Sequence, residues 1–155
     1  MGFGPCGLLG HSLGGAAALL AAHKLKTVRS VVTVAAPSDA GHVKHLLSGS
    51  EQDFADDGRA HVTIGGRTFE LEVGFLHDLE VHNVLDAVRE LDRPYMVVHA
   101  DDDTVVPVTE GENLFEAAPG LKRFSRYPAG GHLFGNRDAA EQLAQDVTTW
   151  FSETL

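Results

Sequence analysis

The sequence predicts an α/β protein built around a mainly parallel sheet. One observation is a set of short, nearly continuous apolar runs, at residues 6–9, 28–35 and 95–100, which suit strands covered on both faces. Another is that helical patterns alternate with these runs, as they do in parallel sheets. The third is the run Gly10-His11-Ser12-Leu13-Gly14, which places a serine between an apolar strand and a helix of small residues.

The first half of the chain begins with this strand and helix. Residues 6–9 are expected to form a short buried strand, and residues 12–26, rich in alanine and leucine, a helix. Val31, Val32 and Val34 are β-branched, which favours a second buried strand over 28–35. Ser38 or Asp39 can cap a helix that runs to about residue 47, and residues 48–57 have a polar, loop-like composition.

The second half changes its periodicity twice. Residues 60–64 and 67–73 alternate apolar and polar side chains around Gly65-Gly66, which predicts a β-hairpin. An apolar stripe predicts one helix over 74–91. A buried strand follows at 95–100, then a helix at 109–118, a strand at 124–127 and an amphipathic helix at 138–154. Residues 39–83 are an excursion between two strands, and we expect a lid or cap there.

The composition excludes several classes of protein. The chain has 155 residues, 43% of them hydrophobic, which suits one domain with a core, and its net charge of −10 argues against nucleic acid as a partner. Cys6 is the only cysteine, so no intramolecular disulfide is expected, and its apolar surroundings predict a buried structural thiol. The sequence shows neither a membrane span nor a signal peptide, and a cytoplasmic location is the default.

Ser12 is the candidate nucleophile. A serine in a Gly-x-Ser-x-Gly turn between strand and helix projects its hydroxyl from the top of a sheet. Gly10 and Gly14 are expected because a Cβ at either place would clash in so tight a turn. The following helix brings its N-terminal N–H groups near the position of an oxyanion.

The acid and base candidates follow in the order Ser, Asp, His. Asp101, Asp102 and Asp103 come directly after the strand at 95–100, and the carboxyl ends of parallel strands are where catalytic groups gather. Chemistry alone does not choose among the three. His132 follows two glycines that let a loop approach the serine closely. It would accept the Ser12 proton while an aspartate orients its ring.

The other histidines carry weaker signals. His42 and His45 are spaced for one helix face, and His77 and His82 flank Asp78, but neither spacing makes a closed set of metal ligands. Solvated or capping roles are expected for these four. No metal or cofactor is predicted, and His11, inside the serine turn, is expected to be structural.

Several segments together resemble one group of known proteins. They are the serine turn, the run AAPSD at 35–39 with the histidines that follow it, the hairpin turn GGRTF at 65–69, FLHDL at 75–79, and His99 to Asp103. The chain resembles the α/β-hydrolase modules that are often fused to an OsmC-like peroxide-resistance domain. The resemblance implies cofactor-free hydrolysis of carboxylic esters, with Ser12 as nucleophile, Asp103 as acid, His132 as base and the N–H of Leu13 in the oxyanion hole.

The sequence departs from this family at its start, where the family has further strands. The expected architecture over 1–155 is therefore a single truncated domain: the C-terminal half of an α/β-hydrolase fold, with a helix–hairpin cap at about 39–83. The family's second oxyanion donor lies in the missing half. Two functions follow: a serine esterase for small or short-chain esters, or a weak or inactive module that self-associates or complements a separate N-terminal half. An uncovered edge at Cys6–Leu9 and the first helix predicts a homodimer.

Overall fold

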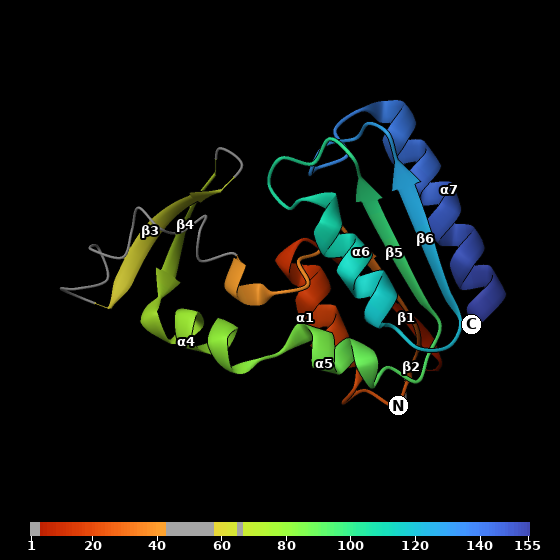
Figure 1. Ribbon diagram of the computed structural model, residues 1–155, viewed down its shortest axis with the longest axis horizontal. Coiled ribbons are helices and arrows are strands. Elements are labelled where there is room, and N and C mark those ends of the chain that lie inside the picture. The colour runs from red at the N-terminus through yellow and green to blue at the C-terminus, as the bar shows by residue number, and fades with distance from the viewer. Residues whose placement is uncertain (1–3, 43–57, 65–66) are drawn as a thin grey trace. The chain divides into compact units, whose positions relative to one another are not determined.

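The computed structural model describes residues 4–42, 58–64 and 67–155. They belong to two compact units, one made of Met1–Ser38 and Val84–Leu155 and the other of Asp39–Asn83. The first unit holds a four-stranded sheet of β1 (Cys6–His11), β2 (Val28–Val34), β5 (Tyr95–Ala100) and β6 (Lys122–Tyr127). The strands lie in the order β1-β2-β5-β6, and each neighbouring pair is parallel (Figure 1). The predicted α/β class is confirmed.

Helices cover both faces of this sheet. On one face lie α1 (Leu13–Ala22), α5 (Val84–Arg89) and α6 (Val108–Ala117), and on the other lies α7 (Arg137–Thr154) (Figure 1). Trp150 of α7 is buried in one core cluster with Val32 of β2 and Met96 of β5. Large apolar side chains between helix and sheet therefore hold the strands whose carboxyl ends carry the candidate residues.

Two predicted helices end earlier than the pattern indicated. The helix α1 stops at Ala22 rather than near residue 26, and Nη1 of Arg93 donates hydrogen bonds to the carbonyls of Ala22 (2.7 Å) and Leu25 (2.8 Å). The helix expected over 74–91 is two helices, α4 (Val73–Val81) and α5. Between them His82 is extended, and its Nδ1–H donates to the carbonyl of Asp78 at 2.9 Å. At both places side chains thus donate hydrogen bonds to backbone carbonyls that would accept from backbone N–H groups in a longer helix.

The second unit contains the predicted hairpin. Its strands β3 (Arg59–Ile64) and β4 (Arg67–Glu72) pair antiparallel, as the alternating pattern indicated. Of the helix expected to run to residue 47, a single 3₁₀ turn, η1 (Ala40–His42), is described. Residues 43–57, which include His45, and the hairpin turn at 65–66 lie outside the described residues. A cap role for residues 39–83 stays a prediction.

The prediction that β1 is a buried strand is wrong. Cys6 is exposed, so it is no buried thiol, and Leu9 is 47% exposed. Within the described sheet β1 pairs with β2 alone, and the N–H groups of Cys6 and Ser12 both point to that side, to the carbonyls of Thr27 and Val34. Because N–H groups alternate along a strand, those of Gly7, Leu9 and His11 point away from β2.

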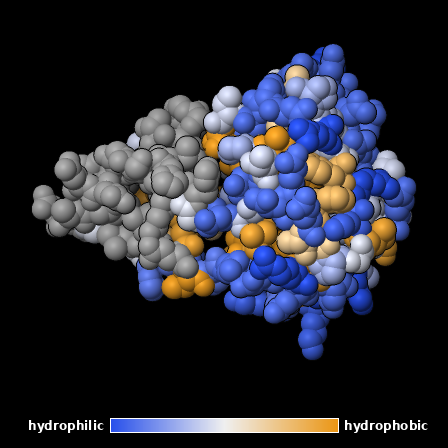
Figure 2. Space-filling model, in the orientation of Figure 1, coloured by the Kyte–Doolittle hydropathy of each residue, from blue (hydrophilic) through white to orange (hydrophobic). Residues whose placement is uncertain are grey.

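The visible surface of the first unit is mostly hydrophilic, with apolar side chains in separate patches (Figure 2). This agrees with the acidic net charge of the sequence. None of the helices in the described ranges combines the length and the apolar character that crossing a bilayer requires.

Candidate active site

Ser12 lies at the turn between β1 and α1, where the sequence placed it. Its backbone has φ 53° and ψ −130°, a conformation that residues other than glycine rarely adopt. The turn is held because Ser12 N–H donates to the carbonyl of Val34 and Gly15 N–H donates to the carbonyl of Ser12, each at 2.8 Å. The strained turn points the hydroxyl away from both the strand and the helix.

The glycines around Ser12 have different reasons to be glycine. A Cβ at Gly10 would lie 2.1 Å from the carbonyl oxygen of Gly14, so no other residue fits there. The clash expected for Gly14 is wrong, because a Cβ at Gly14 would meet open space. The second crowded position is Gly15, where a Cβ would lie 2.6 Å from the Cβ of Ala36. Gly10 and Gly15, rather than Gly10 and Gly14, let the helix approach the sheet.

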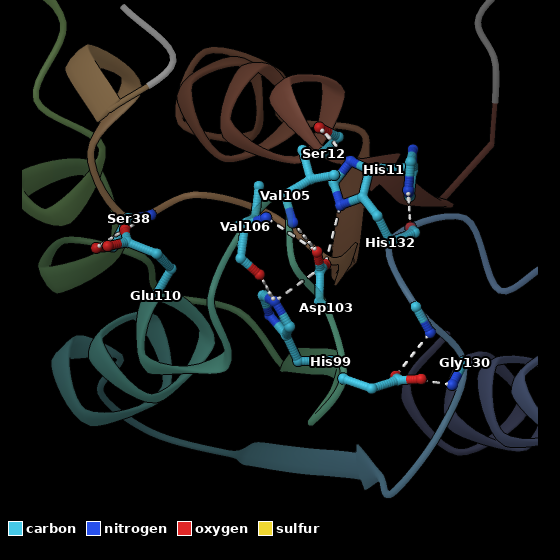
Figure 3. Close-up of polar contacts among 12 residues, drawn as sticks. His11, Ser12, Ser38, His99, Asp103, Val105, Val106, Glu110, Gly130 and His132 are labelled. Carbon is cyan, nitrogen blue, oxygen red and sulfur yellow. Dashed lines mark hydrogen bonds and ion pairs between the residues drawn. The ribbon is translucent and has the colours of Figure 1, made fainter. Parts of the chain in front are cut away.

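The structure brings Ser12, His132 and Asp103 together. Nε2 of His132 lies 3.0 Å from Oγ of Ser12, and Nδ1 of His132 lies 2.9 Å from Oδ2 of Asp103 (Figure 3). A carboxylate can only accept, so Nδ1 carries the proton and the neutral ring has Nε2 free to accept from Ser12. The side chain of Asp103 is fully buried and that of His132 is 10% exposed. A histidine that a buried carboxylate orients in this way can accept the proton of a serine as a general base.

Backbone donors hold the buried carboxylate of Asp103. Its Oδ1 accepts from the N–H groups of Val105 and Val106, each at 2.9 Å. His99, also fully buried, donates from Nε2 to the carbonyl of Val106 at 2.9 Å and lies 3.5 Å from Oδ2 of Asp103. These bonds compensate the carboxylate for the loss of water and fix the direction in which it faces His132.

The three adjacent aspartates have three different partners. Asp103 faces His132, which agrees with the choice that the resemblance implies. Oδ1 of Asp102 accepts from the N–H groups of Gly130 (2.9 Å) and Gly131 (2.7 Å). Asp101 forms an ion pair with Arg126 and, by its hydrogen bond, raises the pKa of that guanidinium above its usual value. Sequence reasoning missed the role of Asp102, although a glycine pair before a histidine was a signal that the loop needed an acceptor.

His11, like Asp102, makes a hydrogen bond that the sequence did not predict. Its Nε2–H donates to the backbone carbonyl of His132 at 2.7 Å, and the two ring centroids are 4.9 Å apart. The residues concerned are 121 positions apart in the chain. His11 is therefore structural, as expected, but its partner is the backbone of the candidate base.

Ser38 and Glu110 connect the segment after β2 to the first turn of α6. Oε2 of Glu110 accepts from the backbone N–H of Ser38 at 2.8 Å and from its hydroxyl at 2.6 Å (Figure 3). Ser38 is buried. The pair fixes the segment that carries Ala36, against which Gly15 packs.

Leu13 begins α1, so its N–H lies among the first N–H groups of the helix, which have no partner within it. Such groups favour a negative charge nearby. This is where the sequence placed an oxyanion donor. Among the residues that the structure describes, no three His, Cys, Asp or Glu side chains are grouped as a metal ion would need.

Comparisons with known proteins identify similar solved structures. No protein-family model matches the sequence, and no curated protein does. The esterase domain of a Rhodothermus marinus protein is 36% identical with a TM-score of 0.85, over 97% of this chain and 62% of that chain. Alpha/beta hydrolase domain-containing protein 10 from mouse is 18% identical with a TM-score of 0.73, over 99% of this chain and 64% of that one.

Est1E from Butyrivibrio proteoclasticus is likewise 18% identical with a TM-score of 0.73, over 94% of this chain and 59% of that one. The chain thus spans about three fifths of the length of each of these three structures.

Proposed function

Since this chain has the α/β-hydrolase fold, we propose that it is a serine esterase that cleaves small or short-chain carboxylic esters through Ser12, His132 and Asp103. The observation that carries the proposal is the continuous path from Oγ of Ser12 through both nitrogens of His132 to a buried carboxylate. The esterase domain of the Rhodothermus marinus protein, at 36% identity, supports this substrate class. No cofactor enters the reaction, and a cytoplasmic location stays a prediction.

The geometry supports acyl transfer in two steps. His132 accepts the proton of Ser12 as Oγ attacks the ester carbonyl, and the N–H of Leu13 faces the oxyanion that forms. The protonated ring then donates its proton to the departing alcohol, which leaves an acyl-serine. Water, deprotonated by His132, attacks this ester in turn, and the proton returns to Ser12 as the acid leaves. Asp103 keeps the ring in the required tautomer and stabilises its charge throughout.

The experiment compares the chain with Ser12→Ala, using p-nitrophenyl acetate as substrate and a fluorophosphonate as label. Wild-type protein is expected to release p-nitrophenol and to take up the label at Ser12. Ser12→Ala should lose both, with activity down by about 10⁴-fold or more. Ser152→Ala, an exposed serine in α7, is the matched control and should keep both.

Two outcomes would reject the proposal. Turnover unchanged in Ser12→Ala would show that another group is the nucleophile. A folded wild-type chain that never takes up the label would favour the alternative of an inactive module.

A second proposal concerns self-association, which the edge of the described sheet favours. The outward N–H groups of β1 can pair with a second copy about a two-fold axis. Beside this edge lies a cavity of about 260 Å³ with mainly apolar walls, formed by Leu9, His11, Val34, Leu133, Phe134, Ala140 and Leu143. Burying this surface against its copy would remove apolar area from water.

Sedimentation velocity at micromolar concentration tests this proposal. A dimer that Leu9→Lys converts to monomer is expected, because the lysine would bring a charge into the interface. Leu121→Lys, at another exposed leucine, is the control and should leave the dimer intact. A wild-type monomer, or a dimer indifferent to Leu9→Lys, would overturn it.

A further inference from the structure

The backbone around His132 is held by side chains outside the proposed triad. The N–H groups of Gly130 and Gly131 donate to one oxygen of Asp102. The carbonyl of His132 accepts from Nε2 of His11 (Figure 3). Three consecutive residues therefore each have a backbone group bound by a side chain from elsewhere in the fold.

The two holding residues are sequence neighbours of the two triad partners. His11, the last residue of β1, directly precedes Ser12, and Asp102, in the turn after β5, directly precedes Asp103. Each of these turns thus presents one side chain to the ring of His132 and one to the backbone of the loop from Gly130 to His132. The ring of His132 and the loop that carries it are thus held by the same two turns. A change in either turn therefore moves the ring and the loop together.

We propose that His11 and Asp102 are positioning residues, which hold the loop so that the ring of His132 reaches Ser12 and Asp103 at once. The proposal rests on the proposed esterase function for its activity readout. Its structural part, the position of the ring, does not depend on that function.

The loop needs such support because its own backbone has little. It lies in neither a helix nor a strand, and Gly131 and Phe134 both have positive φ, 59° and 48°. The side chain of Leu133, directly after His132, is 69% exposed, so the packing of this loop comes from Phe134, which is 6% exposed and belongs to the core cluster. The ring must satisfy two hydrogen bonds of about 3 Å, and a displacement of about 1 Å can cost 10²-fold in rate. The hydrogen bonds that Gly130 and Gly131 donate to the carboxylate of Asp102 are charge-assisted, which makes them stronger than bonds between neutral groups.

The variants distinguish the effect of losing the hydrogen bonds of Asp102 and His11 from the effect of changing the side chain itself. Asp102→Ala and His11→Leu remove the bonds, whereas Asp102→Asn keeps an acceptor oxygen and His11→Gln keeps an N–H donor at a similar reach. Asp101→Ala is the matched control, because its carboxylate is one residue away and pairs with Arg126 instead.

The kinetic expectation is a loss of kcat with little change in KM. Asp102→Ala and His11→Leu should each lower kcat on p-nitrophenyl acetate by about 10- to 100-fold, while the Asn, Gln and control variants stay within about threefold of wild type. The double variant Asp102→Ala, His11→Leu should lose less than the product of the single losses, because both changes release the same loop.

A second readout needs no activity. In ¹⁵N-labelled protein, the proton on Nδ1 of His132 gives a downfield signal that is assigned by its absence in His132→Gln. This signal should persist in wild type, the control and the conservative variants, and should broaden or vanish in Asp102→Ala and His11→Leu. Circular dichroism checks that every variant is folded, and a variant that unfolds is judged through its conservative partner.

The outcomes distinguish the two proposals. Unchanged kcat and an unchanged signal in both disruptive variants would overturn the positioning roles. An inactive wild type whose signal still responds to Asp102→Ala would reject the esterase and keep the positioning residues. Equal losses in the conservative and disruptive variants would show that the hydrogen bonds are not what matters, and would also overturn the inference.

Discussion

The strands that lead to the proposed nucleophile and to the proposed acid are held in different ways. Every residue of β5 is buried, and the strand lies between β2 and β6. β1 pairs only with β2 in the described sheet and exposes Cys6, Leu9 and His11. The position of Asp103 is therefore set by the core around β5. That of Ser12 is set by local geometry, in which one glycine and one strained residue make the turn.

The largest expected effect concerns Asp103, which follows the buried strand β5. Asp103→Asn should lower kcat by about 10⁴-fold, because an amide N–H beside His132 favours the tautomer that cannot accept the proton of Ser12. The fold should be unchanged, since the amide keeps the size of the carboxylate. Asp101→Asn should stay near wild type in the same p-nitrophenyl acetate assay. A loss below tenfold for Asp103→Asn would mean that the core-held acid is not the orienting group.

A difference in stability between the two strands is the next effect. Met96→Ala removes a fully buried side chain from β5 and should lower the free energy of unfolding by about 2–5 kcal/mol. Leu9→Ala on β1, measured on the monomeric chain, should cost less than about 1 kcal/mol, because the side chain is half exposed there. Urea denaturation measures both. Equal costs would show that β1 is as well packed as β5.

The turn at Ser12 can be tested with a matched pair of glycines. Gly10→Ala should destabilise the chain by about 1–3 kcal/mol and slow fluorophosphonate labelling, because its Cβ meets the backbone of α1. Gly14→Ala, where a Cβ meets open space inside a helix, should leave labelling intact and stabilise by up to about 1 kcal/mol. If both variants behaved alike, the turn would not depend on the close approach at Gly10.

The smallest effect comes from a buried tyrosine at the start of β5. Burial raises the pKa of Tyr95 above its ordinary value of 10.0. The unfolded chain therefore loses this proton first, and stability is full below pH 10 and falls as the pH rises. Between pH 10 and 11 one such group lowers the free energy of unfolding by about 1 kcal/mol. Tyr95→Phe should reduce the slope of the unfolding free energy against pH above pH 10. An unchanged slope would show that Tyr95 does not cause this loss of stability.

Much of the first unit was predictable from local patterns. Apolar runs located β2 and β5, because strands buried on both faces have no polar alternation to obscure them. The motif at Ser12 and the chain order of serine, aspartate and histidine predicted a triad, because a strand–turn–helix motif fixes its own geometry. The choice of Asp103 among three adjacent aspartates came from the resemblance to α/β-hydrolases. The hairpin of β3 and β4 followed from its alternation.

The rest depends on contacts between distant segments. The burial of β1 depends on which strands flank it, which its own residues do not encode. The helix break at His82 and the end of α1 at Ala22 come from side chains that bind backbone carbonyls. The same holds for Asp102 and His11, whose partners lie 28 to 29 and 121 positions away. Gly14 and Gly15 were told apart only once Ala36 was placed.

The exposed thiol of Cys6 allows chemical labelling of the side of β1 that has no partner strand within the described sheet. It is the only cysteine of the chain, so a maleimide or iodoacetamide reagent modifies one known position at one end of the edge strand. Its rate of alkylation then reads the solvent access of that edge as a function of protein concentration, in a single mixing experiment. A spin label on the same sulfur would report the distance between the Cys6 positions of two associated copies, with no second cysteine in the chain to confuse that distance.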